Sequence, residues 1–196
     1  MRPLVAAVLI CLPLSAAFAD DKDKKEVSLF DGKTLTGWHV MNGGKFEAKD
    51  GMIQLRGGSG WLRSDKEYAD FVLTLEVRWL KEKQDSGIFL RSGMEGKNWP
   101  DKKVEVQVEN TERVAMLFGT KFKLDKEKAA KALKPLNEWN EYVIRCVGKE
   151  CEVKLNGVVV CTSDDVKLEK GYLGIQGENG NLDFRNIRLQ VVEAKK

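Results

Sequence analysis

The residues best suited to chemistry in this chain lie between positions 86 and 110. Two runs typical of β-strands, SGIFLRSG and KKVEVQVEN, face each other there across a polar link. Alternation of side chains puts Arg91 on one run and Glu105 and Gln107 on the other, among apolar neighbours. Such polar side chains can line a groove that binds a ligand, or they can form the ordinary solvent-facing side of a sheet. The alternation alone leaves both interpretations open.

Several other kinds of active site do not fit this sequence. His39 is the only histidine, which argues against a Ser-His-Asp triad or a multi-histidine zinc site. The cysteines lack CxxC spacing, so a thiolate metal site is not expected. The GGSG at residues 57–60 is not followed by the helix pattern that a phosphate-binding loop needs.

The remaining carboxylates, amides and tryptophans suit sugars. Trp61 or Trp99 can stack on a pyranose, although a single tryptophan in such a run is more often a core residue. Glu, Gln and Arg make paired hydrogen bonds to hydroxyl groups, and two carboxylates can do acid/base work on a glycosidic bond.

The elements that must position these residues are short β-runs separated by Gly, Asn and Asp, beginning at Val27. The longest run, 71–80, alternates apolar and polar residues. About a dozen such runs and one poor helix predict an all-β fold, an antiparallel two-sheet β-sandwich of the jelly-roll kind.

Three local signals refine this fold. Asn156-Gly157 predicts a type I′ hairpin turn within a three-strand meander over residues 142–162. Asp125 is a suitable N-cap for one or two helical turns that end before Pro135. A phase change near Asn186 predicts a β-bulge in the last strand.

The cysteines of the meander have a predictable register. A two-residue turn at Gly148-Lys149 places Cys146 opposite Cys151, at a spacing that suits a disulfide. The same register carries Cys161 to the other face, opposite Glu152. A Cys146–Cys151 bridge and three free thiols both remain open.

Length and charge indicate one soluble domain. The 196 residues suffice for a single sizeable core, and 42% hydrophobic and 32% charged residues are ordinary for a globular protein. The net charge of +3 does not indicate nucleic acid as a partner.

The N-terminus has the pattern of a secretory signal. Residues 1–19 combine Arg2, an apolar run and Ala17-Phe18-Ala19 as a cleavage site. We therefore expect a signal peptide over 1–19, a charged linker over 20–26 and a domain over 27–193. The mature protein is expected to be secreted or periplasmic, with no membrane partner after cleavage.

A series of segments resembles the bacterial 3-keto-disaccharide hydrolase domain family, in the same order and over nearly all of residues 28–190. The segments are FDGKTLTGW, GGSGWLRSDKEYADFVLTLEVRW, DSGIFLRS, VEVQVEN, LNEWNEYVIRC, VKLNGVVV and GYLGIQGENGNLDFRNIRL. The family is similar in fold to concanavalin A-like lectins and glucanases, so the resemblance also implies a concanavalin A-like sandwich.

The resemblance implies an exported glycoside hydrolase or lyase that acts on sugars oxidised at C3. The ketone acidifies the C2 hydrogen, so a base can remove it and the C1 oxygen can leave, with water added later. Direct hydrolysis by an acid and a base is the other route.

The family pattern also implies site residues. Arg91 matches the arginine that ends SGxFxR, and Glu105 with Gln107 matches the ExQ strand. Glu76 matches an acid in the preceding long strand, and Gln176 matches the glutamine of GxxGxQ.

Glu178 shares a face with Gln176 by parity. We expect Glu105 and Glu178 to be the acid/base pair, with Arg91, Gln107 and Gln176 orienting the sugar or stabilising an enolate. Glu76 and Trp61 complete the predicted substrate-binding set. The alternative is that Arg91 and Glu105 form a cross-strand salt bridge that only holds the sheet.

This chain departs from the family in the segment ERVAMLFGTKF, where Phe118 stands in place of a tyrosine hydroxyl. The insert over residues 121–134 also differs from the usual short loop, and both changes are expected to alter the groove or its substrate.

Two other functions stay open, a non-catalytic carbohydrate-binding module of the same fold and an interaction domain without a sugar site. We expect a carbohydrate as the partner and no cofactor or metal ligand set, and we leave assistance by a divalent cation open.

Overall fold

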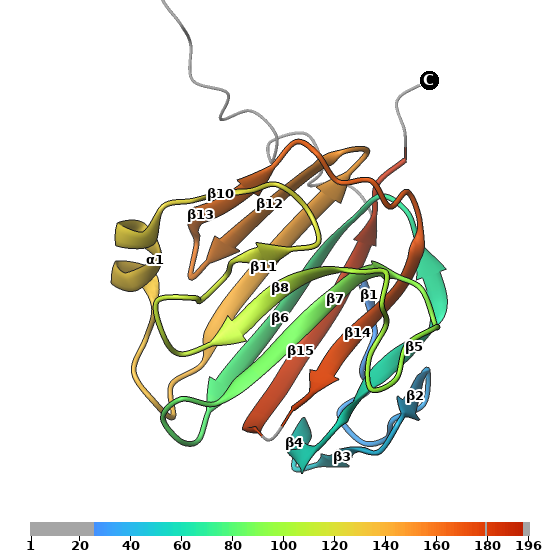
Figure 1. The fold of residues 1–196 in the computed structure, drawn as a ribbon. Coiled ribbons are helices and arrows are strands. Elements are labelled where there is room, and N and C mark those ends of the chain that lie inside the picture. The colour runs from blue at the N-terminus through green and yellow to red at the C-terminus, as the bar shows by residue number, and fades with distance from the viewer. Residues whose placement is uncertain (1–25, 179, 194–196) are drawn as a thin grey trace, which may run out of the picture.

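The computed structural model describes residues 26–178 and 180–193, which form two antiparallel sheets packed face to face (Figure 1). The first sheet has the strand order β10 (Lys123–Leu124), β13 (Val158–Ser163), β12 (Glu150–Leu155), β11 (Asn140–Val147), β6 (Phe71–Trp79), β15 (Asn181–Val191), β4 (Met52–Gly58) and β3 (Gly44–Lys49), and β1 (Val27–Ser28) pairs with β15. The second has the order β2 (Trp38–Met41), β5 (Gly60–Tyr68), β14 (Gly171–Gly177), β7 (Asp85–Ser92), β8 (Val104–Glu109) and β9 (Leu117–Phe118). The predicted antiparallel sandwich is confirmed. We call these sheet A and sheet B.

The core lies between the two sheets. The inward row of β6 is at most 2% exposed and comprises Phe71, Leu73, Leu75, Val77 and Trp79. Trp79 Nε1 donates to the carbonyl oxygen of Val108 in sheet B at 3.5 Å, so one side chain links the two sheets. The alternation predicted for residues 71–80 is confirmed, because every second residue is removed from water.

The local signals also hold. Asn156 and Gly157 have φ values of 49° and 82°, as a type I′ turn requires. Helix α1 (Lys126–Ala132) begins after Asp125, whose side chain accepts a hydrogen bond from the backbone N–H of Lys128. The pairing of β15 with β6 shifts between Arg185 and Arg188, which confirms the predicted bulge.

The cysteine register is half right. Cys146 lies opposite Cys151 as predicted. Cys161, however, lies opposite Val153 and faces the core with Cys151, because the β12–β13 register shifts after Val153. The prediction that placed Cys161 opposite Glu152 is therefore wrong, since a bulge breaks the alternation on which it depended. All three side chains are buried free thiols.

A third bulge changes the direction of Arg91. Phe89 of β7 lies opposite Gly174 of β14, while Ser92 lies opposite Tyr172, so two β7 residues oppose one β14 residue. Arg91 has a φ of 48°, in the left-handed region. The extra residue moves Arg91 off the face that Gly87 and Phe89 share.

The Arg91 side chain is wholly buried at the end of the sandwich. It donates to the carbonyl oxygens of Ala69, Gly148 and Leu168, each at 2.7 Å, and pairs with Asp70 at 2.9 Å. Arg91 thus joins three loops and contacts neither Glu105 nor the outward face of sheet B. The prediction that it orients a sugar is wrong, and so is the alternative of an Arg91–Glu105 salt bridge.

We expect Arg91→Met to reduce the free energy of unfolding by about 3–5 kcal/mol, because it removes the positive charge that pairs with Asp70 and the donor of three loop carbonyl oxygens. Arg91→Lys should not restore stability, because an ammonium cannot reproduce the geometry of the guanidinium. Urea unfolding measures both effects.

The matched control is Arg188→Met, which removes an exposed ion pair with Glu26 and should cost under about 1 kcal/mol. Equal losses from Arg91→Met and Arg188→Met would contradict the structural role of Arg91.

Candidate active site

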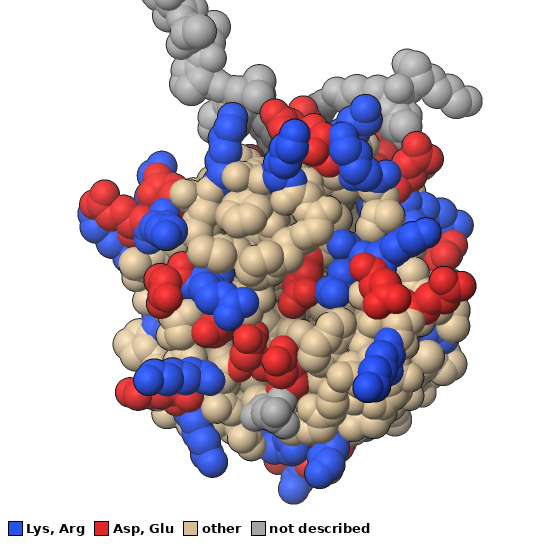
Figure 2. All heavy atoms as spheres, viewed as in Figure 1, with Lys and Arg blue, Asp and Glu red and all other residues tan. Residues whose placement is uncertain are grey.

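Carboxylates gather at the centre of the outward face of sheet B. Gly87 lies opposite Gln107, and Phe89 lies opposite Glu105, so these four residues share that face. Figure 2 shows acidic side chains reaching into a hollow in the middle of the molecule, with basic side chains on both sides of it. The ordinary solvent-facing interpretation of this strand does not apply, because Glu105 is 8% and Gln107 only 2% exposed.

The Glu105 carboxyl group lies over Gly87. A Cβ atom at position 87 would be 2.5 Å from Glu105 Oε1, so the glycine makes room for this carboxyl group. Burial raises the pKa of Glu105 to about 7. The positive charge of Lys103, 3.8 Å away, opposes the rise, whereas the charges of Asp85 and Glu178 add to it. Glu105 therefore keeps its proton up to neutral pH.

Gln107 holds two further carboxylates. Its Nε2 donates to Asp85 Oδ1 at 2.6 Å and to Glu109 Oε2 at 3.2 Å. Burial raises the pKa of Asp85 to about 6, and the charges of Glu178 and Glu109 add to this effect. Arg113 pairs with Glu109 at 3.3 Å and partly balances the negative charge.

The sequence prediction missed Asp85. The signal was present, because Asp85 lies two residues before Gly87 in β7 and so has the same parity as the predicted face. Glu109 continues the alternation of Glu105 and Gln107 in the same way.

Glu178 follows β14 directly and is half-buried. Its charge raises the pKa of both Asp85 and Glu105, so these three carboxylates lie within electrostatic range of one another. Chain segments about 70 residues apart thus meet on one side of the molecule.

Gln176 and Trp61 lie opposite each other on β14 and β5. Among the described residues, neither Gln176 Oε1 nor Trp61 Nε1 has a hydrogen-bond partner, although both atoms are buried. Buried polar atoms without a partner are typical of a place where a ligand or ordered water completes the hydrogen bonds.

Trp61 does not offer a stacking surface. Its side chain is 0% exposed, and its ring contacts Phe89 at a centroid distance of 5.9 Å and covers Gly174. The prediction of a sugar stacked on Trp61 is wrong, because the ring is packed into the floor of the face. Trp99 is half-buried in the loop between β7 and β8, and Asn42 bonds to this loop at Asn98.

Glu76 lies on the outward face of sheet A. It accepts hydrogen bonds from Arg185 Nε and Asn186 Nδ2, both at 2.6 Å. Since packed sheets lie about 10 Å apart and the site faces outward from sheet B, Glu76 is on the opposite side of the sandwich. Its predicted place in the substrate-binding set is wrong.

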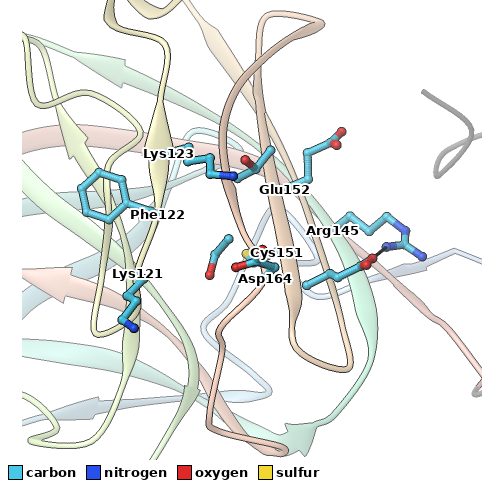
Figure 3. Close-up of a pocket in the computed structure, with 10 residues that line it drawn as sticks. Lys121, Phe122, Lys123, Arg145, Cys151, Glu152 and Asp164 are labelled. Carbon is cyan, nitrogen blue, oxygen red and sulfur yellow. Dashed lines mark ion pairs between the residues drawn. The ribbon is translucent and has the colours of Figure 1, made fainter. Parts of the chain in front are cut away.

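A cavity of about 660 Å³ lies elsewhere, between the segment carrying residues 121–123 and the strands β11 to β13 (Figure 3). Its lining residues are Lys121, Phe122, Lys123, Arg145, Glu150, Cys151, Glu152, Thr162, Ser163 and Asp164. None of the predicted site residues lines it.

Within residues 26–178 and 180–193, no three His, Cys, Asp or Glu side chains are grouped closely enough to hold a metal ion. In the same part of the chain, no helix has the length and apolar character needed to cross a membrane.

The sandwich and its carboxylate-bearing face define a carbohydrate-related β-sandwich domain. The chain belongs to the family described as the 3-keto-alpha-glucoside-1,2-lyase-like domain, whose model matches residues 25–190. No curated protein matches the chain.

Two solved structures of candidate glycosyl hydrolases from Parabacteroides distasonis have this fold. One is 21% identical, with a TM-score of 0.68 over 86% of this chain and 94% of its own. The other is 23% identical, with a TM-score of 0.69 over 86% of this chain and 100% of its own. The carbohydrate-binding module CBM66 from Bacillus subtilis is 16% identical, with a TM-score of 0.56 over 79% of this chain and 95% of its own.

The pKa of Glu105 leads to a prediction about stability. Because it rises from 4.5 to about 7 on folding, the folded state binds the proton more tightly than the unfolded state. The free energy of unfolding should therefore fall as pH rises from 4.5 to about 7, by up to about 3 kcal/mol for this group. Glu105→Gln should remove this part of the loss, which urea unfolding at about pH 5 and about pH 8 measures.

The Gly87→Ala variant tests the position of the same carboxyl group, which lies over Gly87. The new methyl group should push the Glu105 side chain toward water, because a Cβ atom there would lie 2.5 Å from Oε1 and 2.9 Å from Cγ of Glu105. The pH-dependent loss of stability should then shrink. An unchanged loss in both variants would contradict a buried, protonated Glu105.

Proposed function

We propose that this chain is an exported enzyme that cleaves the glycosidic bond of 3-keto-glycosides, without a bound cofactor. The observation that carries the proposal is the buried carboxyl group of Glu105, which has a pKa of about 7. This group lies within electrostatic range of the second carboxylate, Glu178. The family to which the chain belongs supports the substrate class.

The proposed reaction is an elimination followed by addition of water. The C3 ketone acidifies the C2 hydrogen, and a base removes that proton to form an enolate. The electron pair then forms the C1–C2 double bond as the C1–O bond breaks, and an acid protonates the leaving oxygen. Water added across the double bond gives the free 3-keto sugar.

The two carboxyl groups have different environments, which suits different roles. Glu105 keeps its proton to about neutral pH and is proposed as the acid. Glu178, half-buried at the end of β14, is proposed as the base. Lys103 places a positive charge 3.8 Å from Glu105, where it can stabilise negative charge on the enolate.

The amides take supporting roles. Both contacts of Gln107 Nε2 go to Asp85 and Glu109, so we propose that Gln107 positions these carboxylates rather than the sugar. The unpaired Oε1 of Gln176 is proposed to accept a hydrogen bond from a sugar hydroxyl.

The decisive experiment measures sugar release from 3-keto-trehalose and a 3-keto-glucoside. The wild type should release free sugar, and Glu105→Gln or Glu178→Gln should lower turnover by about 100-fold or more while substrate still binds. Glu76→Gln is the matched control, because it makes the same substitution on the opposite sheet and should keep turnover.

No release by the wild type would contradict the proposal. If the wild type binds these sugars without releasing product, and Glu105→Gln binds them equally well, the chain is a carbohydrate-binding module. Absence of both binding and release would support an interaction domain.

The pH dependence gives an independent prediction. Since Glu105 must be protonated to act as the acid, kcat/KM should fall as pH rises through about 7. A rate that rises steadily across this range would contradict the assignment of Glu105.

The route is tested in deuterated water. Elimination followed by addition exchanges the C2 hydrogen, so product trapped at early times should carry deuterium at C2 beyond the uncatalysed level. Direct hydrolysis leaves the C2 hydrogen in place.

A further inference from the structure

Two exposed aromatic side chains lie beside the carboxylate cluster and have no part in the proposed acid/base chemistry. Phe118 and Phe122 are each 36% exposed, although apolar side chains of this size are usually covered. Their rings meet at a centroid distance of 6.4 Å and an angle of 73°. The pair therefore forms a corner rather than a flat platform.

The register of sheet B fixes where this corner lies. Phe118 of β9 is directly opposite Glu105 of β8, so both side chains project from the same face. The Glu105 carboxyl group lies over Gly87 of β7, on the other side of β8. A substrate whose scissile bond lies at Glu105 therefore meets different residues on its two sides. On the side of β7 and β14 it meets Asp85, Glu178 and Gln176, and on the side of β9 it meets Phe118.

The surroundings hold the corner in place. The Arg113 guanidinium lies 5.6 Å from the centre of the Phe118 ring and pairs with Glu109 at 3.3 Å. Phe122, which also lines the cavity of Figure 3, points to the side of its segment opposite Lys123, and its ring contacts Phe118. Figure 2 shows an uncharged surface directly above the acidic hollow.

We propose that Phe118 and Phe122 form the subsite for the leaving group, and that this subsite takes an aromatic aglycone. The inference rests on the proposed function, because Glu105 locates the scissile bond. The substrate class is then 3-keto-glycosides of aryl or arylmethyl alcohols.

Ring geometry favours an aromatic aglycone over a second sugar. An aromatic ring placed in a corner of two phenyl rings makes one stacked and one edge-to-face contact, the two arrangements that aromatic pairs prefer. A sugar leaving group needs hydrogen-bond partners for its hydroxyls, and a phenylalanine ring offers none.

The test compares benzyl and methyl 3-keto-glucosides, whose leaving alcohols have similar acidity but differ in the aromatic ring. In the wild type, kcat/KM should be higher for the benzyl compound. Phe118→Ala and Phe122→Ala should each lower this benzyl-to-methyl ratio about 10-fold, while activity on the methyl compound changes little.

Two controls separate the ring from general damage. Phe118→Tyr keeps the ring and should keep the ratio within about threefold of the wild type. Val158→Ala removes another exposed apolar side chain, on a strand of sheet A, and should leave the ratio unchanged.

Binding to Glu105→Gln keeps the subsite testable without turnover. Calorimetry should show that this variant binds the benzyl compound more tightly than the methyl compound, and that adding Phe118→Ala removes the difference. If the wild type releases no sugar but this difference in binding remains, the proposed reaction fails and the aromatic subsite stands. A benzyl-to-methyl ratio unaffected by Phe118→Ala, in turnover and in binding, overturns the subsite even if the enzyme is active.

Discussion

Hydrophobic packing between the two sheets fixes which side chains can reach the outward face of sheet B. Val104, Val106 and Val108 of β8 are completely buried against the core. Because strand residues alternate between faces, the residues between them must point outward. A shift of one residue would exchange the two sets and bury charges in the core, so the register that builds the core also gathers the carboxylates.

The site then combines burial with like charge. Glu105 and Asp85 both have raised pKa values because water is removed from them and because neighbouring carboxylates repel a further negative charge. Such an arrangement opposes stability at neutral pH and is commonly found where a protein needs an acid. Gly87 makes it sterically feasible, since any larger side chain there would occupy the space of the Glu105 carboxyl group.

Alternation predicted the sandwich, the inward row of β6 and the shared face of Glu105 and Gln107, because these features depend only on regular strands. It failed for Arg91 and Cys161, where one inserted residue changes the parity of everything beyond it. The positions of these two bulges could not have been predicted from one strand alone, because a bulge depends on how a strand fits the partner with which it pairs.

The prediction for Glu76 was wrong for a different reason. Its own strand was predicted well, but alternation within a strand does not say which sheet the strand joins. Trp61 shows a second limit, because its ring is buried and contacts Phe89 on another strand, a contact that alternation within β5 does not encode. The grouping of Asp85 with Glu178 likewise depends on contacts between distant segments, which no local pattern encodes.

The stretch from β9 to β10, residues 117–124, passes from the edge of sheet B to the edge of sheet A and carries both phenylalanines. Leu117 is fully buried and Phe118 pairs with Glu105, but residues 119–122 lie outside both strands, and the floor beneath the Glu105 carboxyl group comes from Gly87 of β7. Replacing this short strap with strap sequences from homologous domains is therefore a route to new leaving-group preferences that leaves the acid and the base untouched. The molecule separates bond cleavage from substrate choice along its chain, which makes the strap a natural unit for directed evolution.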